Sequence, residues 1–279
     1  MTKAEGIALV TGASRGLGRA VALELARRGF EVVATMRRPE DGADLAGEAT
    51  GNGGGRLRVE SLDVTRPETI RIPDGLKVLV NNAGVEGPWF PVEHTPPSVW
   101  REIFETNVFG LAEVTRRAIP KLRAGGGGVV CNVTSCSILV PMPFLAAYRA
   151  SKAAVSTLGE SLRTELAPFG IRLVEIQPGA IATDMLAGAA GEPEAIGCAG
   201  YEAMGRAVYA SRAEATTHPT PAQSAARAIA DAVLADGASL RHACDPMGEG
   251  LLNAWRTSDD ETMMRGMLEL FAGGVAGDA

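Results

Sequence analysis

The stretch 7-IALVTGASRGLG-18 determines the fold expected for this chain. A short apolar run leads directly into a turn with three glycines, and the apolar helical pattern 19-RAVALELARRG-29 follows. Gly12 permits a tight turn, Gly16 lacks the Cβ that would block a pyrophosphate, and Gly18 lets helix and strand approach closely. The free N–H groups at the start of such a helix attract phosphates. This order predicts a dinucleotide-binding unit rather than a turn that only reverses the chain.

Short apolar strands continue to alternate with longer helices as far as residue 183. Such alternation indicates a parallel sheet covered on both faces, so we expect an α/β, doubly wound, Rossmann-like fold in a single domain over residues 1–279. The expected strands are 7-IALVTG, 31-EVVATM, 57-LRVESLDV, 77-KVLVNNAG, 128-GVVCNVTS and 171-IRLVEIQPG. The expected helices span about 17–28, 98–123 and 147–167, with a weaker one near 40–49.

Four segments depart from this pattern. The segment 47-GEATGNGGGR-56 contains five glycines and predicts a flexible connection. The segment 64–77 is too short for a full crossover helix. The segment 186–221 is rich in Gly, Ala and Pro, and predicts an irregular substrate loop. The segment 240–271 has the pattern of a short strand and one or two amphipathic helices.

Composition excludes several classes of partner. The 279 residues are 46% hydrophobic and 22% charged, as in an ordinary globular protein. The net charge of −6 and pI near 5.3 argue against nucleic acid or an anionic membrane as a partner. Only three histidines are present, so no metal site is expected. The four cysteines form no CxxC pair, and the start 1-MTKAEGIALVTGAS lacks a leader pattern, so we expect a cytoplasmic protein with free thiols.

The stretch 146-AAYRASKAAV-155 places Tyr148 and Lys152 four residues apart on an otherwise apolar helix. Positions i and i+4 share one helix face, so the two side chains are neighbours. A surface pair is one interpretation. The other is a phenol whose pKa, ordinarily near 10, is lowered by the cation until it exchanges protons near neutral pH.

These motifs together resemble the short-chain dehydrogenase/reductase family. The family's motifs occur in order with fitting intervals over residues 5–185, and the resemblance is poor beyond them. The motifs are the TGxxxGxG turn at 11–18, 63-DV-64, 81-NNAG-84, 106-TNVFG-110, 132-NVTS-135, the Tyr148–Lys152 pair and 178-PGAIAT-183.

The resemblance implies an oxidoreductase that interconverts a secondary alcohol and a carbonyl with a nicotinamide cofactor. It implies that Tyr148 exchanges a proton with the substrate oxygen and that Lys152 also holds the nicotinamide ribose. Ser135 would orient the substrate oxygen, and Asn107 would anchor a water that links Lys152 to solvent. The implied cofactor-binding residues, Asp63 at the adenine among them, are Gly12, Ser14, Arg15, Gly16, Leu17, Gly18, Arg37, Asp63, Val64, Asn81, Ala83, Gly84, Tyr148, Lys152, Pro178, Gly179, Ile181 and Thr183.

Neighbouring side chains offer rival chemistry at this site. Thr134 and Ser137 are rival hydroxyls, but the spacing to Tyr148 favours Ser135. Cys136 suggests thiol catalysis, yet no His or Asn constellation accompanies it, so we expect a pocket-lining or buried thiol.

The end of the second strand distinguishes between NAD and NADP. NAD usually meets a carboxylate there, whereas the 2′-phosphate of NADP needs cationic partners. Here Met36 occupies the expected acidic position, Arg37 and Arg38 follow it, and Arg15 lies in the glycine turn. We therefore expect NADP.

Two other functions are considered. A non-catalytic NADP-binding regulator would use the same fold, but the intact Asn–Ser–Tyr–Lys set argues against it. An epimerase or dehydratase of the extended relatives is disfavoured by the TGxxxGxG spacing and the short C-terminal part.

The resemblance also implies a homodimer through the helices at about 98–123 and 147–167. Their apolar positions Val108, Leu111, Val155 and Leu158 exceed what packing on a sheet requires. A tetramer is uncertain, because the final strand with which many family members build one is replaced by 240–271.

The segments that follow the strands predict the substrate. No Arg or Lys is placed among them to hold a carboxylate or phosphate, and Glu86 and Glu93 would repel an anion. We expect a neutral, largely hydrophobic carbonyl or alcohol compound, covered by a lid at 186–210. The expected apolar pocket residues are Trp89, Phe90, Cys136, Ile138, Met142, Phe144, Met185, Leu186, Tyr201 and Met204.

Overall fold

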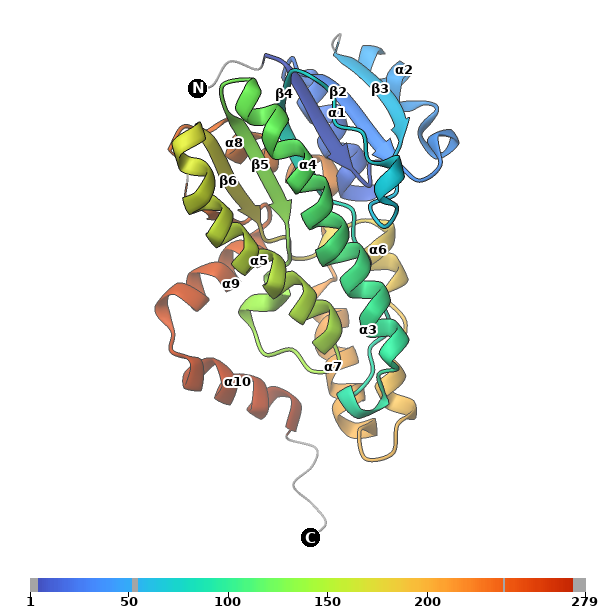
Figure 1. Cartoon of the computed structure of the whole chain (residues 1–279). Coiled ribbons are helices and arrows are strands. Elements are labelled where there is room, and N and C mark those ends of the chain that lie inside the picture. The colour runs from blue at the N-terminus through green and yellow to red at the C-terminus, as the bar shows by residue number, and fades with distance from the viewer. Residues whose placement is uncertain (1–4, 52–54, 238, 273–279) are drawn as a thin grey trace.

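The computed structural model describes residues 5–51, 55–237 and 239–272. Within these ranges seven parallel strands form one sheet in the order β3-β2-β1-β4-β5-β6-β9 (Figure 1). The strands are β1 Ile7–Thr11, β2 Glu31–Met36, β3 Arg56–Ser61, β4 Leu76–Asn81, β5 Gly128–Val133, β6 Ile171–Ile176 and β9 Arg241–His242, while β7 Ile181–Ala182 and β8 Thr220–Pro221 form a separate pair. The helices are α1 Gly16–Arg27, α2 Leu45–Gly51, α3 Pro97–Phe104, α4 Leu111–Ala124, α5 Ala146–Leu166, α6 Asp184–Gly188, α7 Glu202–Ala215, α8 Ala222–Leu234, α9 Pro246–Thr257 and α10 Asp260–Ala272. The predicted doubly wound α/β fold is confirmed.

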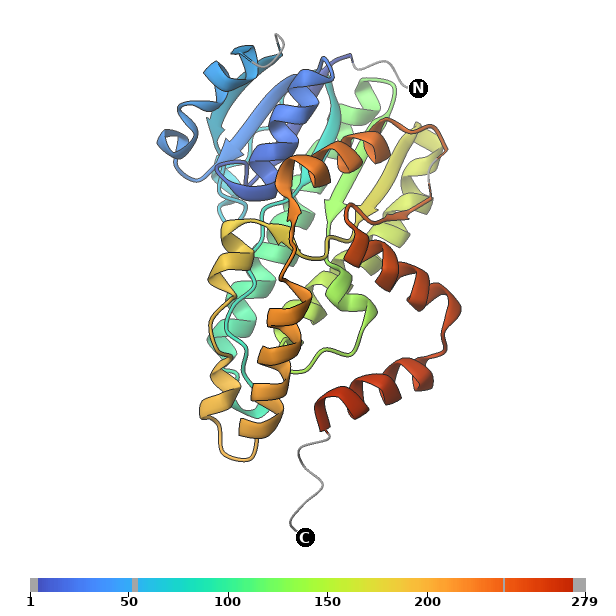
Figure 2. The ribbon, with the colours of Figure 1, turned by 180° about the vertical axis from the view of Figure 1, so that it is seen from behind.

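Helices cover both faces of the sheet. Alternate residues of β1 point to opposite sides: Ala8 and Val10 pack in the core formed with α1 and α8, and Leu9 packs in the core formed with α4 and α5. Figure 1 shows α4 and α5 in front of the sheet, and Figure 2 shows α1 and α8 on the other face. Because both faces are buried, the strands are almost continuously apolar.

The strand order reverses between β1 and β4. β1 pairs with both β2 and β4, and the chain leaves β1 towards β2 but leaves β4 towards β5. The loops after β1 and β4 therefore diverge, and the crevice between them at the carboxyl ends of the strands is where such sheets bind ligands.

Most predicted elements are present with shifted ends. Strands β3 and β6 end before their motif residues, whereas the motifs 81–84 and 132–135 begin in the last residues of β4 and β5. The expected helix at 98–123 consists of α3, the π-helical segment Glu105–Gly110 and α4. As expected, the connection from β3 to β4 contains only the 3-10 turn Pro67–Thr69.

Residues 47–51 belong to α2, contrary to the flexible connection expected there, and 52–54 lie outside the described residues. Leu45 and Ala49 of α2 are buried, so packing of the helix outweighs the helix-destabilising effect of its glycines.

The expectation of an irregular segment at 186–221 is wrong for a large part of it. It contains the end of α6, the 3-10 turn Glu194–Gly197 and the whole of α7. A Cβ at Gly205 would lie 3.0 Å from the backbone N of Ile196, so the small residue permits α7 to pack closely on the preceding turn. At Gly205, therefore, the small residue reflects close packing.

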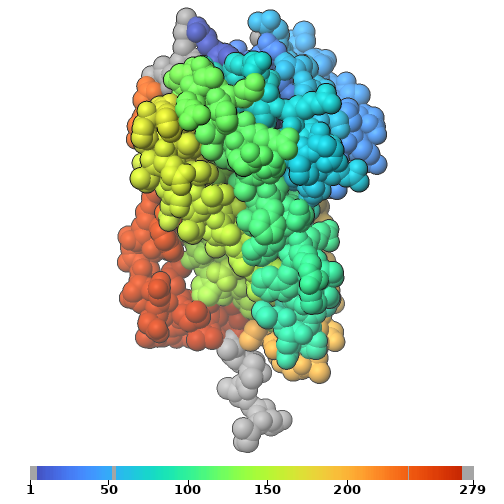
Figure 3. Space-filling model, in the orientation of Figure 1, coloured from blue at the N-terminus to red at the C-terminus, as the bar shows by residue number. Residues whose placement is uncertain are grey.

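The C-terminal segment has the expected strand and helices. It begins with β9, continues through α9 and ends in α10, which form the lower left surface in Figure 3. Phe271 of α10 is buried in a cluster with Trp89, Phe144 and Tyr148. The last helix therefore reaches the predicted substrate pocket.

The apolar positions taken as evidence for a homodimer are largely used inside the subunit. Leu111 and Val155 are buried, and Leu158 packs against the core. Val108, the fourth, is half-buried. The homodimer stays a prediction, without the support of an excess of apolar residues.

No helix within the described ranges has the length and apolarity needed to cross a membrane. The same ranges contain no group of three or more His, Cys, Asp or Glu side chains arranged to hold a metal ion. Cys131, Cys136 and Cys244 are buried free thiols, and Cys198 is a half-buried one.

The glycine turn provides a test of the fold. A Cβ at Gly18 would lie 2.3 Å from Asn82 Nδ2 and 2.4 Å from Gly12 O. Gly18→Ala should therefore lower the free energy of unfolding by about 1–3 kcal/mol through overpacking. Gly250→Ala in α9, where no atom lies within 4 Å of the added Cβ, should instead raise it by about 0.5–1 kcal/mol. Chemical denaturation measures both, and equal stability of the two variants would contradict this packing.

Candidate active site

The glycine turn after β1 closes tightly on the loop after β4. Gly12 has a φ of +66°, and its Cβ would lie 2.8 Å from Ala83 Cα. Gly16 has a φ of +57° and faces Thr183, with 3.4 Å to the side chain from an added Cβ. These two positions require glycine because side chains disfavour a positive φ, and at Gly12 also because of the contact.

Two polar residues that were not predicted from the sequence hold this turn. Asn82 Nδ2 donates to the carbonyl oxygens of Thr11 at 3.0 Å and Gly12 at 3.1 Å. Thr11 Oγ1 accepts from the backbone N–H groups of Asn82 at 3.0 Å and Ala83 at 3.1 Å. Both lie within the recognised TGxxxGxG and NNAG motifs, so the motifs already contained the signal.

The start of α1 is suited to phosphate. The residue before the helix, Arg15, makes no side-chain cap, so no described side chain occupies the first N–H groups of α1. Ser14 is half-buried in the turn, and Leu17 packs against the core. Free N–H groups at a helix start, with glycines that allow close approach, fit the pyrophosphate of a dinucleotide.

Tyr148 and Lys152 are not a surface pair. Their exposed fractions are only 8% and 5%. Lys152 Nζ donates to the carbonyl oxygen of Val133 at 2.9 Å and lies 5.7 Å from the centre of the Tyr148 ring. α5 thus carries the phenol and the ammonium side by side against the end of β5.

Asn107 connects this pair to the loop after β4. Its Oδ1 accepts from Val85 N at 2.8 Å, and its Nδ2 donates to Val85 O at 2.8 Å and to Ser151 Oγ at 3.0 Å. A Cβ on Gly84 would lie 3.2 Å from Asn107 Oδ1 and 3.4 Å from Lys152 Nζ. The predicted Asn107, Gly84 and Lys152 are therefore brought together.

Ser135 is the hydroxyl that meets the phenol. It forms a hydrogen bond with Tyr148, which acts to lower the tyrosine pKa. The rival Thr134 is engaged elsewhere, because its Oγ1 donates to Glu175 Oε1 at 2.9 Å. The backbone N–H of Ser137 donates to Ser135 Oγ at 3.2 Å, while the buried Ser137 Oγ has no partner among the described residues.

Burial dominates the electrostatics of the site. It raises the pKa of Tyr148, the negative charge of Glu86 raises it further, and the Ser135 hydrogen bond only partly opposes them. This differs from the expected lowering by the cation, because the dry surroundings disfavour the phenolate. Burial also lowers the pKa of Lys152 to about 8. The protein alone thus holds Tyr148 as a neutral phenol, the form that donates a proton.

Asn81, predicted to bind the cofactor, lies inside the sheet. Its Nδ2 donates to Thr115 Oγ1 and to Asn132 Oδ1, both at 2.9 Å, and its exposed fraction is 3%. The side chain therefore braces β4 against α4 and β5, and supports the cofactor loop from behind.

Asp63 and Val64 form the turn after β3. Asp63 Oδ1 accepts from the backbone N of Thr65 at 3.0 Å and from its Oγ1 at 2.8 Å. Val64 is buried against Gly110, where an added Cβ would approach to 2.8 Å. Both residues shape the rim on which an adenine is expected.

The segment after β6 is held by Asp245, which was not predicted. Gly179 N donates to Asp245 Oδ2 at 2.7 Å, and Gly248 N donates to Asp245 Oδ1 at 2.9 Å at the start of α9. Cys136 N donates to Pro178 O at 2.9 Å. The sequence signal was the Asp-Pro pair typical of a helix start.

Thr183 and Ile181 complete the cofactor side of this segment. Thr183 caps α6 by accepting from Leu186 N at 3.4 Å, and Ile181 pairs with Thr220 in the small sheet. These contacts fix the chain opposite the glycine turn, where Thr183 faces Gly16.

The residues expected to choose the cofactor lie at the ends of β1 and β2. Met36 is buried, whereas Arg15 and Arg37 are exposed. Arg15 Nε is 3.7 Å from Asp184 Oδ2, and Arg38 pairs with Asp41. The Arg37 guanidinium has no hydrogen bond or ion pair with another described residue, which leaves it available for an anion.

Five of the ten expected apolar pocket residues gather around Tyr148. One cluster joins the phenol to aromatic and thioether side chains, and a neighbouring cluster of Cys136 and Ile138 packs on α9. Phe144 has a φ of 64°, the only positive φ of a non-glycine residue in the described ranges, and such strain is often found at functional sites. The cluster at Tyr148 includes Trp89, Met142, Phe144, Tyr201 and Met204.

A cavity of about 300 Å³ lies beside this cluster. Its lining includes Glu86, Trp89, Met185 and, from α7, Arg212. The segments that follow the strands did not predict Arg212, which reaches this cavity because α7 folds back over the segment after β4. The guanidinium is already engaged: it lies 4.6 Å from the Trp89 ring centre and donates to Gly191 O at 2.8 Å.

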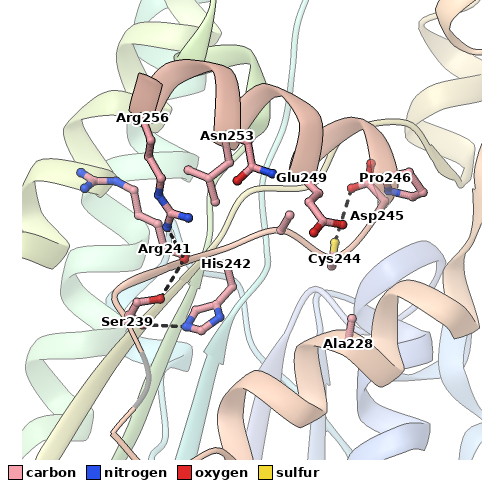
Figure 4. A pocket seen from close by; sticks show the side chains of 12 residues that line it. Ala228, Ser239, Arg241, His242, Cys244, Asp245, Pro246, Glu249, Asn253 and Arg256 are labelled. Carbon is pink, nitrogen blue, oxygen red and sulfur yellow. Dashed lines mark hydrogen bonds between the residues drawn. The ribbon is translucent and has the colours of Figure 1, made fainter. Parts of the chain in front are cut away.

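A second cavity, of about 480 Å³, lies between β9, α8 and α9 (Figure 4). None of the predicted site residues lines it. Arg241 at its wall pairs with Glu160 and lies 5.1 Å from the Trp255 ring centre, and His242 Nε2 lies 2.6 Å from Ser239 O. These contacts attach α9 to the edge of the sheet.

A model of the short chain dehydrogenase family matches residues 6–193, so the chain belongs to this family. An uncharacterized oxidoreductase of Bacillus subtilis (strain 168) is 41% identical over 188 residues, 64% of this chain and 66% of the relative. Estradiol 17-beta-dehydrogenase 2 of Rattus norvegicus is 40% identical over 191 residues, 64% of this chain and 49% of the relative. The match thus spans about half to two thirds of these relatives.

Similarity to solved structures extends over almost the whole chain. A short chain dehydrogenase from Burkholderia cenocepacia J2315, solved in complex with NADP, superposes with a TM-score of 0.75 at 27% identity. The superposition covers 96% of this chain and 99% of that one.

Burial of the Lys152 ammonium should lower the free energy of unfolding by a measurable amount. Because the native pKa of Lys152 is about 8 and the ordinary value is 10.5, the unfolded chain binds more protons between these values. The contribution of Lys152 to the free energy of unfolding therefore rises with pH across this window. Lys152→Met should stabilise the protein at pH 7 by up to about 3 kcal/mol, and less at pH 10. Urea denaturation of both proteins at the two pH values measures this, and a destabilised variant at pH 7 would contradict it.

Proposed function

We propose that this protein is an NADP(H)-dependent oxidoreductase that interconverts a secondary alcohol and a ketone or aldehyde on a neutral, largely hydrophobic substrate. The observation that carries the proposal is the buried pair on α5: Tyr148 contacts Ser135 on one side and lies beside Lys152 on the other, at the floor of an apolar cluster. A Tyr and a Lys that served only as a solvated surface pair would not be buried in this way.

The residues divide the work at the substrate oxygen. Ser135 donates a hydrogen bond that orients this oxygen, and Tyr148 gives its proton to it during reduction or accepts one during oxidation. Lys152 supplies positive charge beside the phenolate and holds the ribose, and Asn107 positions the loop beneath it. The bound nicotinamide supplies or accepts the hydride. The raised pKa of Tyr148 keeps the phenol protonated at neutral pH, which is the form needed to protonate the substrate oxygen during reduction.

The cofactor proposal rests on two exposed arginines. Arg15 and Arg37 are exposed at the carboxyl ends of two paired strands, and the apolar Met36 occupies the position where a carboxylate would repel a 2′-phosphate. The cofactor-bound neighbour from Burkholderia supports the same choice. The segment 186–210, which includes part of α7, is proposed as the cover of the pocket.

Loss of the phenolic proton tests the reaction. Tyr148→Phe should lower kcat by at least about 10²-fold, since a positioned general acid contributes about 10²–10⁴-fold. Binding of NADPH should stay close to normal, because the ring and Lys152 remain. The assay follows absorbance of the reduced nicotinamide over a panel of neutral ketones, with phosphorylated and carboxylated ones included. If the wild type binds NADPH tightly but turns over none of these compounds, the non-catalytic regulator is favoured instead.

The cofactor preference is tested separately. The wild type should prefer NADPH to NADH, and Arg15→Ala with Arg37→Ala should weaken NADPH binding at least about tenfold, because two charge-assisted hydrogen bonds are lost. NADH binding should barely change, and Arg38→Ala, whose side chain already pairs with Asp41, serves as the control. Equal affinity of the wild type for both cofactors would refute NADP.

A further inference from the structure

Glu86 is a carboxyl group at the edge of an otherwise apolar site. It follows the loop after β4, is half-buried and lines the cavity of about 300 Å³ beside Trp89. Trp89 belongs to the cluster that contains Tyr148, and the charge of Glu86 acts on the Tyr148 phenol. Glu86 therefore lies where a substrate bound at Tyr148 would extend.

Only one of its two carboxyl oxygens is satisfied. Trp89 Nε1 donates to Glu86 Oε1 at 2.6 Å, while Oε2 has no hydrogen bond with any described residue. Burial raises the pKa of Glu86, and the Trp89 hydrogen bond and the positive charge of Arg212 lower it. Oε2 is thus left to water from the cavity.

A fully apolar substrate would conflict with this oxygen. When such a molecule displaces the water, Oε2 loses its donors, and an unsatisfied buried acceptor is unfavourable, more so when it is charged. A substrate with a hydrogen-bond donor at this point avoids the cost. The site can then discriminate strongly against the analogue without the donor, because that analogue leaves the carboxylate unpaired.

The surroundings favour a neutral donor over a cationic one. Arg212 lies over the Trp89 ring at 4.6 Å and lines the same cavity, so a substrate ammonium would meet a guanidinium. Glu192 and Glu194 also line the cavity, but both are exposed, so solvent screens their charges more than that of the half-buried Glu86. A hydroxyl fits this balance of charges.

We propose that Glu86 is a specificity-determining residue whose free carboxyl oxygen accepts a hydrogen bond from a hydroxyl group of the substrate, so that the preferred substrates are hydroxy ketones or the corresponding diols. This rests on the proposed carbonyl–alcohol chemistry at Tyr148 and narrows its substrate class. The remainder of the substrate stays apolar, as the aromatic cluster requires.

The test uses matched pairs of ketones. Each pair has the same carbon skeleton, with a hydroxyl in one member and a methyl in the other, at two to five carbons from the carbonyl. Binding is measured by calorimetry on Tyr148→Phe protein saturated with NADPH, and kcat/KM is measured on the Tyr148-containing enzyme. Binding does not depend on turnover, so failure of the chemistry and failure of the Glu86 assignment give different results.

The hydroxyl member should bind and react at least about tenfold better at one chain length, the equivalent of about 1.4 kcal/mol. Glu86→Leu should remove this preference while the methyl ketones still bind. Glu86→Gln, which keeps a neutral acceptor, should retain part of it, and Trp89→Phe should weaken it because Glu86 loses the hydrogen bond that positions it. A preference that survives in Glu86→Leu, absence of any preference in the wild type, or stronger binding of amino ketones than of hydroxy ketones would overturn the proposal.

Discussion

The burial of one ammonium group on an apolar helix is the constraint around which the site is built. Lys152 is 5% exposed, and among the described residues no carboxylate pairs with it. Its partner is the carbonyl oxygen of Val133 at the end of β5, so α5 must lie at a fixed height against that strand. The same placement brings Tyr148 next to Ser135. Asn107 and Lys152 both approach Gly84, where a side chain would crowd them. Burying a charge with so little solvation destabilises the fold, and such groups are concentrated at functional sites.

The sheet and the motif residues could be predicted because both depend on local patterns. The strand at 7–11 and the turn at 11–18 follow from apolar runs and glycines that only one backbone arrangement accommodates. Asn107, Ser135, Tyr148 and Lys152 are brought together as the motif order implied. The electrostatics could not be obtained this way, since the pKa of Tyr148 depends on burial by distant segments and on Glu86, and a spacing of four residues reveals neither.

Residues 186–221 show where composition fails to predict structure. Their Gly and Ala content predicts an irregular chain, yet at Gly205 the helix α7 packs on the turn before it. Composition alone does not distinguish a small residue needed for contact from one that leaves the chain loose. Because α7 was not foreseen, neither was Arg212, which reaches the pocket only through that helix. Asp245 and Phe271 likewise act across large sequence separations.

The two halves of the chain therefore make different contributions to function. The first half, up to the loop after β5, supplies the glycine turn, Asn107 and Ser135, and α5 adds Tyr148, the proposed proton donor. Selectivity depends on segments that close over this machinery from later in the chain: α7 with Arg212, the turn with Glu194, and α10 with Phe271. Glu86 belongs to the first half but is held in place through Trp89, which Glu194 and Arg212 fix from the second. If the proposed chemistry holds, a change in α7 should alter the substrate preference through the orientation of Glu86, while the proton transfer at Tyr148 continues.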